Sequence, residues 1–206
     1  MNSLYLRLWY MLTGWGAVGV VYSLTSSQDQ ASAHLLQPSV VDLWFKFDPN
    51  AIWLYLSFFI LCAYAYLCCP QQRLVWLARS MQLSAIGAGI VFTLWPTTME
   101  FPAVTQETLS ADVLRLLIQL DSLQNCLPSL HVTLTILAVY ALWQKTQLLR
   151  SFLIALWGVA ITISILQLHR HQFVDALGGA ALAILAGMLA HYILHWKNKR
   201  ILRRTL

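Results

Sequence analysis

Long, uninterrupted runs of apolar residues are the feature that most constrains the fold of this chain. A transmembrane helix needs roughly 20 mostly apolar residues, and 59% of the 206 residues are apolar whereas 10% are charged. A soluble protein carries about a quarter charged residues, so a soluble domain is excluded. A nucleic-acid-binding chain is excluded too, because the cations are too sparse to follow a phosphate backbone. The runs also lack the strict alternation of a membrane barrel, so we predict an all-α integral membrane protein.

We expect one membrane domain, residues 1–206, with six transmembrane helices in one bundle. The charges between the helices predict their orientation, because Lys and Arg accumulate on the cytoplasmic side. Alternate connections and both terminal segments hold ten Lys and Arg residues and no acid, whereas the other connections hold three cations and all eight acids. Both termini should therefore be cytoplasmic. The predicted spans are residues 4–24, 51–69, 75–95, 129–143, 151–168 and 174–196.

The first span also has features of a signal peptide, since residues 31–33 read Ala-Ser-Ala, like a small-residue cleavage site. Its apolar run is longer than the usual 7 to 15 residues of a signal peptide, and it lacks a basic head. We therefore expect an uncleaved first helix.

Polar residues that could bind a ligand or take part in catalysis occur in two of the connections that hold the acids. The first of these segments precedes the fourth span. Proline favours the first position of a helix, so we expect Pro128 to begin this helix and to leave the amides of Ser129, Leu130 and His131 without intrahelical partners. Such amides, with the helix dipole, bind anions. The Ser129 hydroxyl adds a donor, and His131 adds an ionisable group. A histidine at a helix start is more often a structural cap, so this pattern alone is a weak indication.

The second segment precedes the sixth span and contains His171 and Asp175. Residues four apart share one face of a helix, so the carboxylate can hold one imidazole nitrogen and leave the other as a base or nucleophile. An aspartate beside an apolar span is a functional candidate by default. The alternative is that Asp175 only caps the helix. Gly178 and Gly179, which follow, are expected to allow close helix packing.

Together these segments resemble the type 2 phosphatidic acid phosphatase superfamily, and most closely its branch of inositol phosphorylceramide synthase-like membrane proteins. The resemblance rests on Cys-Leu-Pro-Ser-Leu-His at 126–131 and His-x3-Asp-x2-Gly-Gly at 171–179. It extends to Asp-x3-Asn at 121–125, Trp-Pro-Thr-Thr at 95–98 and Asp-Pro-Asn-x2-Trp at 48–53. The family's fold of six membrane helices, with both motifs on one side, agrees with the predicted topology.

The resemblance implies phosphoryl chemistry through a phosphohistidine, without a cofactor or metal. His171 would attack phosphorus, Asp175 would orient it, and His131 would protonate the leaving oxygen. Ser129 and the amide of Leu130 would hold the phosphoryl oxygens. The expected substrate is a lipid phosphate such as a polyprenyl diphosphate or phosphatidate, reached from membrane lipid at the non-cytoplasmic leaflet, with the bacterial inner membrane as the expected location.

The sequence departs from the family pattern in its cations. The first motif, Lys-x6-Arg-Pro, is absent, and Ile165 follows Ser164 where an arginine is expected. Phosphoryl transfer needs cationic stabilisation, and arginine suits phosphate, so Arg170 is the first candidate and Arg115 the second. Arg115 can instead snorkel from an amphipathic segment.

Three other functions remain open at this point. A metal enzyme could use His131, His169, His171 and Asp175 as ligands, and a non-catalytic lipid or ion carrier could use the same groups as a relay. A family member without the first motif could also be an inactive structural partner. His191 and His195 are also four apart, but a favourable position near a helix C-terminus explains them more simply.

Overall fold

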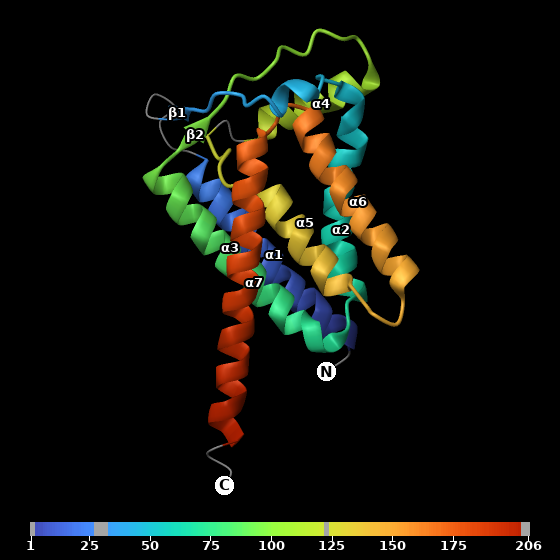
Figure 1. Cartoon of the computed structure of the whole chain (residues 1–206), viewed down its shortest axis with the longest axis vertical. Coiled ribbons are helices and arrows are strands. Elements are labelled where there is room, and N and C mark those ends of the chain that lie inside the picture. Colours follow the sequence, from blue (N-terminus) through green and yellow to red (C-terminus); the bar gives the residue numbers. More distant parts are fainter. Residues whose placement is uncertain (1–2, 27–32, 122–123, 203–206) are drawn as a thin grey trace.

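The computed structural model describes residues 3–26, 33–121 and 124–202, and these residues are overwhelmingly helical (Figure 1). Two short 3-10 helices, η2 (Asp42–Trp44) and η3 (Pro49–Ala51), precede α2, and two parallel strands, β1 (His34–Leu35) and β2 (Thr97–Thr98), link two connections. The prediction of an all-α protein is therefore right apart from one two-residue ladder. The helices are α1 (Ser3–Thr25), α2 (Ile52–Cys68), α3 (Gln71–Leu94), α4 (Leu109–Leu120), α5 (Leu130–Leu142), α6 (Leu148–Gln167) and α7 (Phe173–Leu202).

Four helical segments of the described chain are long and apolar enough to cross a membrane. They are Pro49–Cys68, Gln71–Leu94, Leu148–Gln167 and Phe173–Trp196. These segments coincide with predicted spans and support a membrane protein. The other two predicted spans are also helices. α1 has 23 residues but is not among the four, and α5 has 13 residues, or about 20 Å, which is shorter than the bilayer core of roughly 30 Å.

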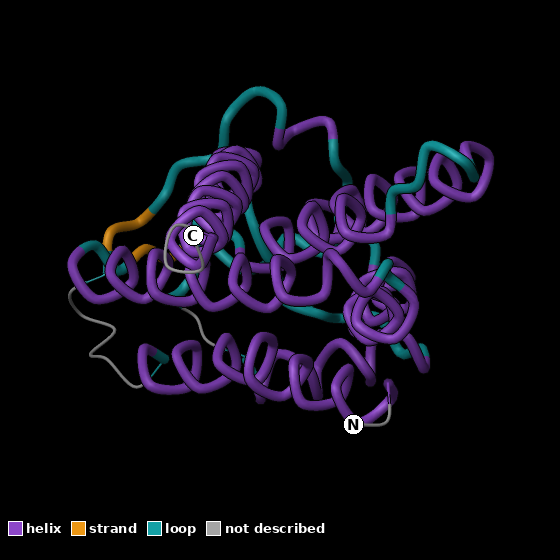
Figure 2. The backbone as a smooth tube through the Cα atoms, turned by 90° about the horizontal axis from the view of Figure 1, so that it is seen from below, coloured by secondary structure: helices purple, strands orange, loops and turns teal. Residues whose placement is uncertain are grey.

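The short helix α5 lies in the middle of the bundle. It packs against α2, α3, α6 and α7, and most of its residues, including Ala138 and Ala141, are fully enclosed. A helix surrounded by protein does not need to match the thickness of the lipid, because its ends meet protein groups. Figure 2 shows α7 nearly end-on, whereas α1 and α3 lie side by side across the view.

Arginines at one end of the bundle satisfy the last carbonyl groups of two helices. Arg7 donates to the carbonyls of Tyr66 and Cys69 at the end of α2, and Arg73 donates to those of Tyr140 and Trp143 at the end of α5. The last carbonyls of a helix lack intrahelical donors, so these contacts stabilise the ends. Figure 1 places both chain ends at this side, away from α4 and the strands.

The amphipathic segment around Arg115 forms the helix α4. Thr108 caps it by accepting the Ala111 amide at 3.2 Å, and the indole of Trp53 donates to Ser110 at 3.0 Å. Its inner side chains, among them Leu114, are buried against the start of α2. α4 thus covers the end of the bundle that carries the candidate site (Figure 1).

Gly179 brings α7 close to the start of α5, as its position in the sequence predicts. A Cβ at Gly179 would collide with the Ser129 carbonyl, and one at Gly178 would lie 2.6 Å from a methyl group of Leu127. The Thr133 hydroxyl donates to the Gly179 carbonyl at 2.8 Å. This close approach places the two predicted motifs beside each other.

Candidate active site

The residue pair His171 and Asp175 is held by the turn that begins α7. Nδ1 of His171 lies 3.4 Å from Oδ2 of Asp175, and the Asp175 side chain is fully buried. The same Oδ2 accepts the backbone N–H of Gln172 at 2.8 Å, while the Gln172 carbonyl accepts the Asp175 amide at 3.0 Å. The first of these bonds is one half of a capping box, in which the third residue of the helix accepts the N-cap amide, whereas the second joins backbone to backbone.

His171 and Asp175 are therefore close for a reason other than the shared helical face that the sequence predicts. α7 begins at Phe173, so His171 precedes the helix and the two residues do not share a helical face. Asp175 does both things that were considered as alternatives, since it caps the helix and also faces the imidazole. His171 Nδ1 and Asp175 Oδ1 have no hydrogen-bond partner among the described residues, so this buried polar pair retains hydrogen-bonding capacity.

The second histidine, His131, lies in the first turn of α5 and is close to the first. The ring centroids of His131 and His171 are 5.8 Å apart. Nε2 of His131 is 2.8 Å from the hydroxyl of Tyr55 on α2, and the rings of Tyr55 and Phe58 pack beside it. The structure thus brings the two predicted catalytic histidines together. Tyr55 was not predicted, because nothing distinguishes it from other aromatic residues of an apolar span.

Ser129 has a more structural position than expected. α5 begins at Leu130, so Ser129 is its N-cap and Pro128 lies outside the helix, contrary to the prediction. The Ser129 hydroxyl accepts the Val132 amide at 3.4 Å, and its backbone N–H donates to the Asp175 carbonyl at 3.0 Å. The Ser129 amide is therefore committed to joining the two motifs, and the first-turn amides of Leu130 and His131 are the ones that lack an intrahelical acceptor.

Arg170 is buried in the site and forms an ion pair. One terminal nitrogen donates to Oδ2 of Asp121 at 2.8 Å, and the guanidinium lies 4.7 Å from the centroid of the Phe101 ring. Its Nε and its other terminal nitrogen have no hydrogen-bond partner among the described residues. Arg170, the residue that precedes His171 in the chain, thus offers buried N–H groups.

Asp121 joins this arginine to α1, because its other oxygen accepts a hydrogen bond from the Tyr22 hydroxyl. Burial raises the pKa of the Asp121 carboxyl, but Arg170, together with His131 and the hydrogen bonds from Tyr22 and Arg170, lowers it by more, so the pKa lies below its usual value. Asp121 is therefore a carboxylate at neutral pH. In the sequence, Asp121 appears only as the first residue of the Asp-x3-Asn motif at 121–125, and no local pattern predicts its partners.

Arg115, the second predicted cation, has other partners. Its guanidinium donates to the carbonyls of Val104 and Gln106 and forms a half-exposed ion pair with Asp112 at 2.7 Å. These contacts fasten the preceding loop to α4. Arg115 does not line the cavity beside His131.

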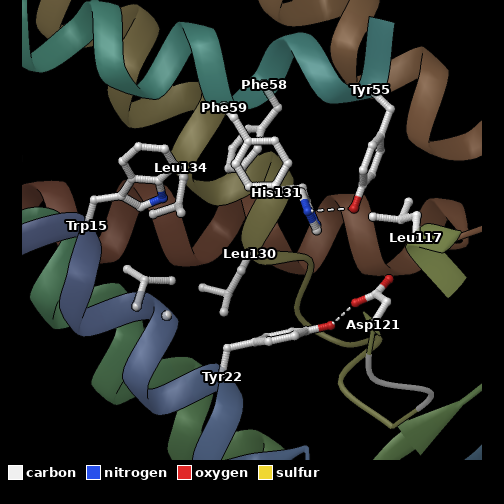
Figure 3. Close-up of a pocket in the computed structure, with 12 residues that line it drawn as sticks. Trp15, Tyr22, Tyr55, Phe58, Phe59, Leu117, Asp121, Leu130, His131 and Leu134 are labelled. Atoms are coloured by element: carbon white, nitrogen blue, oxygen red, sulfur yellow. Dashed lines mark hydrogen bonds between the residues drawn. The ribbon is translucent and has the colours of Figure 1, made fainter. Parts of the chain in front are cut away.

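An apolar cavity of about 320 Å³ adjoins the site between α1, α2 and α5 (Figure 3). Its polar groups, Asp121, His131, Tyr55 and Tyr22, gather toward one end, whereas Trp15 lies at the other. The cavity therefore joins ionisable groups to a hydrocarbon-like interior.

The described residues show no cluster of three or more His, Cys, Asp and Glu side chains that could hold a metal ion. His169, one ligand of the metal alternative, places its Nε2 2.8 Å from the Phe45 carbonyl. Its backbone adopts a positive φ of 47°.

A family model of the PAP2 superfamily, the type 2 phosphatidic acid phosphatases, matches residues 49–189. The chain belongs to the PAP2 superfamily. Both motifs of the site lie in the matched part, as do α2 to α6, whereas α1 precedes it. The predicted superfamily is therefore confirmed, and membership indicates a phosphatase or phosphotransferase type of activity. No curated protein and no solved structure matches the chain.

Proposed function

We propose that this PAP2 protein is a lipid phosphatase or phosphotransferase that acts on a long-chain lipid phosphate through a phosphohistidine. The observation that carries the proposal is the pair of histidine rings 5.8 Å apart, with the buried Asp175 carboxylate beside one ring and the buried Arg170 guanidinium nearby. Nucleophile, orienting carboxylate, acid and cation are the parts that phosphoryl transfer requires. The adjoining apolar cavity suits an ester with a hydrocarbon tail.

In the proposed reaction, Nδ1 of His171 faces Asp175, so Nε2 attacks phosphorus. The bond from phosphorus to the leaving oxygen breaks, and His131 donates a proton to that oxygen. Water or an alcohol then attacks the phosphohistidine, returns a proton to His131 and releases His171. Water gives a phosphatase, and an alcohol gives a headgroup transferase of the inositol phosphorylceramide synthase type.

The phosphoryl oxygens need donors in a site from which water is largely excluded. We assign this role to the N–H groups of Arg170 that lack partners and to the first-turn amides of Leu130 and His131. The Ser129 hydroxyl caps the same turn and holds these amides in place. Arg115 is not assigned, because its guanidinium is committed to its own loop.

The proposed site faces the non-cytoplasmic leaflet, which in a bacterial inner membrane is the periplasmic side. The support is the charge asymmetry, since the end of the bundle opposite the site carries Arg7, Arg73, Lys145 and Arg150. Both termini lie at that end (Figure 1), which needs an even number of crossings, and we propose six, with α1 and α5 among them. A substrate with an apolar tail would reach the site sideways from the lipid.

The deciding experiment presents purified protein in detergent with a panel of lipid phosphates and follows free phosphate and new lipid headgroups together. We expect His171→Ala to abolish turnover and the phosphoenzyme. His131→Ala should lose about 10² to 10⁴ in rate on lipid phosphates and recover part of it on a nitrophenyl phosphate, whose leaving group needs no proton. His191→Ala, at an exposed histidine far along α7, is the matched control.

Asp175→Asn tests the carboxylate separately, because asparagine can still accept the Gln172 amide and preserve the helix cap. We expect this variant to resemble His171→Ala, since it removes the charge that faces the imidazole. A quenched phosphoenzyme that maps to His131, or substantial activity of His171→Ala on the activated ester, would reject the assignment. Lipid transport into vesicles without any phosphate release would instead favour the carrier.

A further inference from the structure

The cavity beside His131 has a wall made by one stripe of α1. Trp15, Val18, Gly19 and Tyr22 line it, and residues spaced by three and four positions lie on the same face of a helix. Tyr22 reaches the polar end, where its hydroxyl meets Asp121, whereas Trp15 lies at the far end (Figure 3). These two residues are roughly 10 Å apart along the helix axis.

Resting on the proposed function, we infer that this cavity binds one hydrocarbon chain of the lipid phosphate and that α1 sets the chain length that is accepted. With phosphate beside His131 and Arg170, the first part of the tail enters a space walled by Leu130, Leu134 and Phe58. The volume of about 320 Å³ is at the small end of ligand pockets, roughly 300 to 1,000 Å³. It fits a single chain rather than a bulky headgroup.

The end of the cavity away from the polar groups is lined by Trp15, and Phe59 of the next helix packs near it. Trp15 of α1 and Phe59 of α2 have ring centroids 6.2 Å apart. A chain that extends from the phosphate therefore meets this pair and stops or turns there. Trp15 and Phe59 therefore limit the length of hydrocarbon chain that the cavity accepts.

Gly19 occupies the middle of the stripe and leaves the cavity open. A Cβ at Gly19 would meet nothing within 4 Å, whereas a Cβ at Gly14 of the same helix would lie 2.8 Å from the backbone of Ala78. Close packing thus explains Gly14 but not Gly19, although glycine within a helix costs about 1 kcal/mol relative to alanine. A larger side chain at Gly19 has free space and would occupy the room that we assign to the lipid.

The test measures kcat/KM over a series of alkyl phosphates of increasing chain length, with water-soluble nitrophenyl phosphate as the tail-free reference. For the unchanged protein we expect up to about a fourfold gain for each buried methylene, followed by a plateau when the cavity is full. Gly19→Leu should move the plateau to shorter chains, by about as many carbons as the leucine side chain contains. The ratio of long-chain to nitrophenyl activity should fall at least tenfold.

Val20→Leu is the matched control, because Val20 is the next residue, is 59% exposed and lies off the stripe. Trp15→Ala should act in the opposite direction and move the plateau to longer chains. If Gly19→Leu and Trp15→Ala both keep the original chain-length profile, the inference is overturned while the proposed function stands. Equal loss on tailed and tail-free esters would also overturn it. Absence of activity of the unchanged protein on every ester would reject the proposed function itself.

Discussion

Replacing Asp121 with asparagine tests the buried ion pair that holds Arg170 in the site. The Arg170 side chain is 3% exposed and the Asp121 side chain 13% exposed, and their atoms are 2.8 Å apart. Asparagine keeps the shape of the side chain and can still accept a hydrogen bond from Tyr22. It removes the charge, so the guanidinium is left buried without a counter-ion.

Removing one partner of a buried ion pair costs about 3 to 5 kcal/mol, because the other charge remains desolvated. Water reaches the Asp121 side chain in part, so we expect the lower end, about 3 kcal/mol. For a chain of this length, 1 kcal/mol corresponds to roughly 2 to 4 °C in Tm. Asp121→Asn should therefore lower Tm by roughly 6 to 12 °C.

A double-mutant cycle separates the pair from its surroundings. Arg170→Met alone should also destabilise the protein, since it leaves the carboxylate uncompensated. In Asp121→Asn/Arg170→Met neither charge of the pair remains, so the double variant should lose less than the two single losses together, with a coupling of about 2 kcal/mol. The measurement is unfolding in detergent, followed by helical circular dichroism or tryptophan fluorescence.

The exposed pair of Arg115 and Asp112 provides the control. These side chains are 39% and 66% exposed at an almost identical distance of 2.7 Å, and exposed pairs contribute at most about 1 kcal/mol. Asp112→Asn should therefore shift Tm by less than roughly 4 °C. If Asp121→Asn is no more destabilising than Asp112→Asn, or if the cycle is additive, the ion pair does not hold Arg170 as described.

Three further predictions concern pH, sidedness and metal. Folding lowers the pKa of Asp121 from the usual 3.8. The stabilisation by this carboxylate is therefore complete above about pH 4 and is lost as the pH falls through the lower folded pKa. The difference in stability between the unchanged protein and Asp121→Asn should be constant from pH 8 to 5 and shrink only below pH 4. With the exposed Cys68 replaced by serine, a cysteine at the exposed Glu107 should react with an impermeant maleimide outside sealed cells, whereas one at the exposed Lys145 should not; reversed labelling would reverse the proposed topology. Activity should survive exhaustive chelation, whereas loss on chelation and rescue by zinc would indicate metal-activated water.

The helices could be predicted well because lipid leaves few alternatives for an apolar run. The predicted span 151–168 is the helix Leu148–Gln167, and the predicted span 174–196 lies within Phe173–Leu202. The helix α4 was harder, since its 12 residues carry only one buried face and lie within a polar connection. Ser110, Ala111 and Leu114 have the spacing of such a face, so the signal was present, but it is short.

The candidate site also has parts that the sequence predicts and parts that it does not. His131, His171 and Asp175 could be named as candidates because each belongs to a local motif, although His171 and Asp175 meet through the turn before α7 and not on one helical face. The partners Tyr55 and Tyr22 come from other helices, and their contacts depend on packing that no local pattern encodes. The error at Pro128 has a local cause: the rule for helix starts places proline first, but Ser129 is itself a favourable N-cap and its amide binds the Asp175 carbonyl.

The proposed chemistry and the proposed chain-length selectivity lie in different parts of this chain. The proposed nucleophile, acid and cation all lie within residues 49–189, which match the PAP2 superfamily, whereas α1 lies outside them. α1 contributes the Tyr22 hydroxyl, which donates to Asp121, and the stripe of residues that includes Gly19 and lines the cavity. Substitutions along this stripe should therefore change which chain is accepted, and those at Tyr22 should change how firmly Arg170 is held, while the distance between the two histidines stays the same. A change in chain preference without a change in nitrophenyl phosphate turnover is the kinetic signature of that separation.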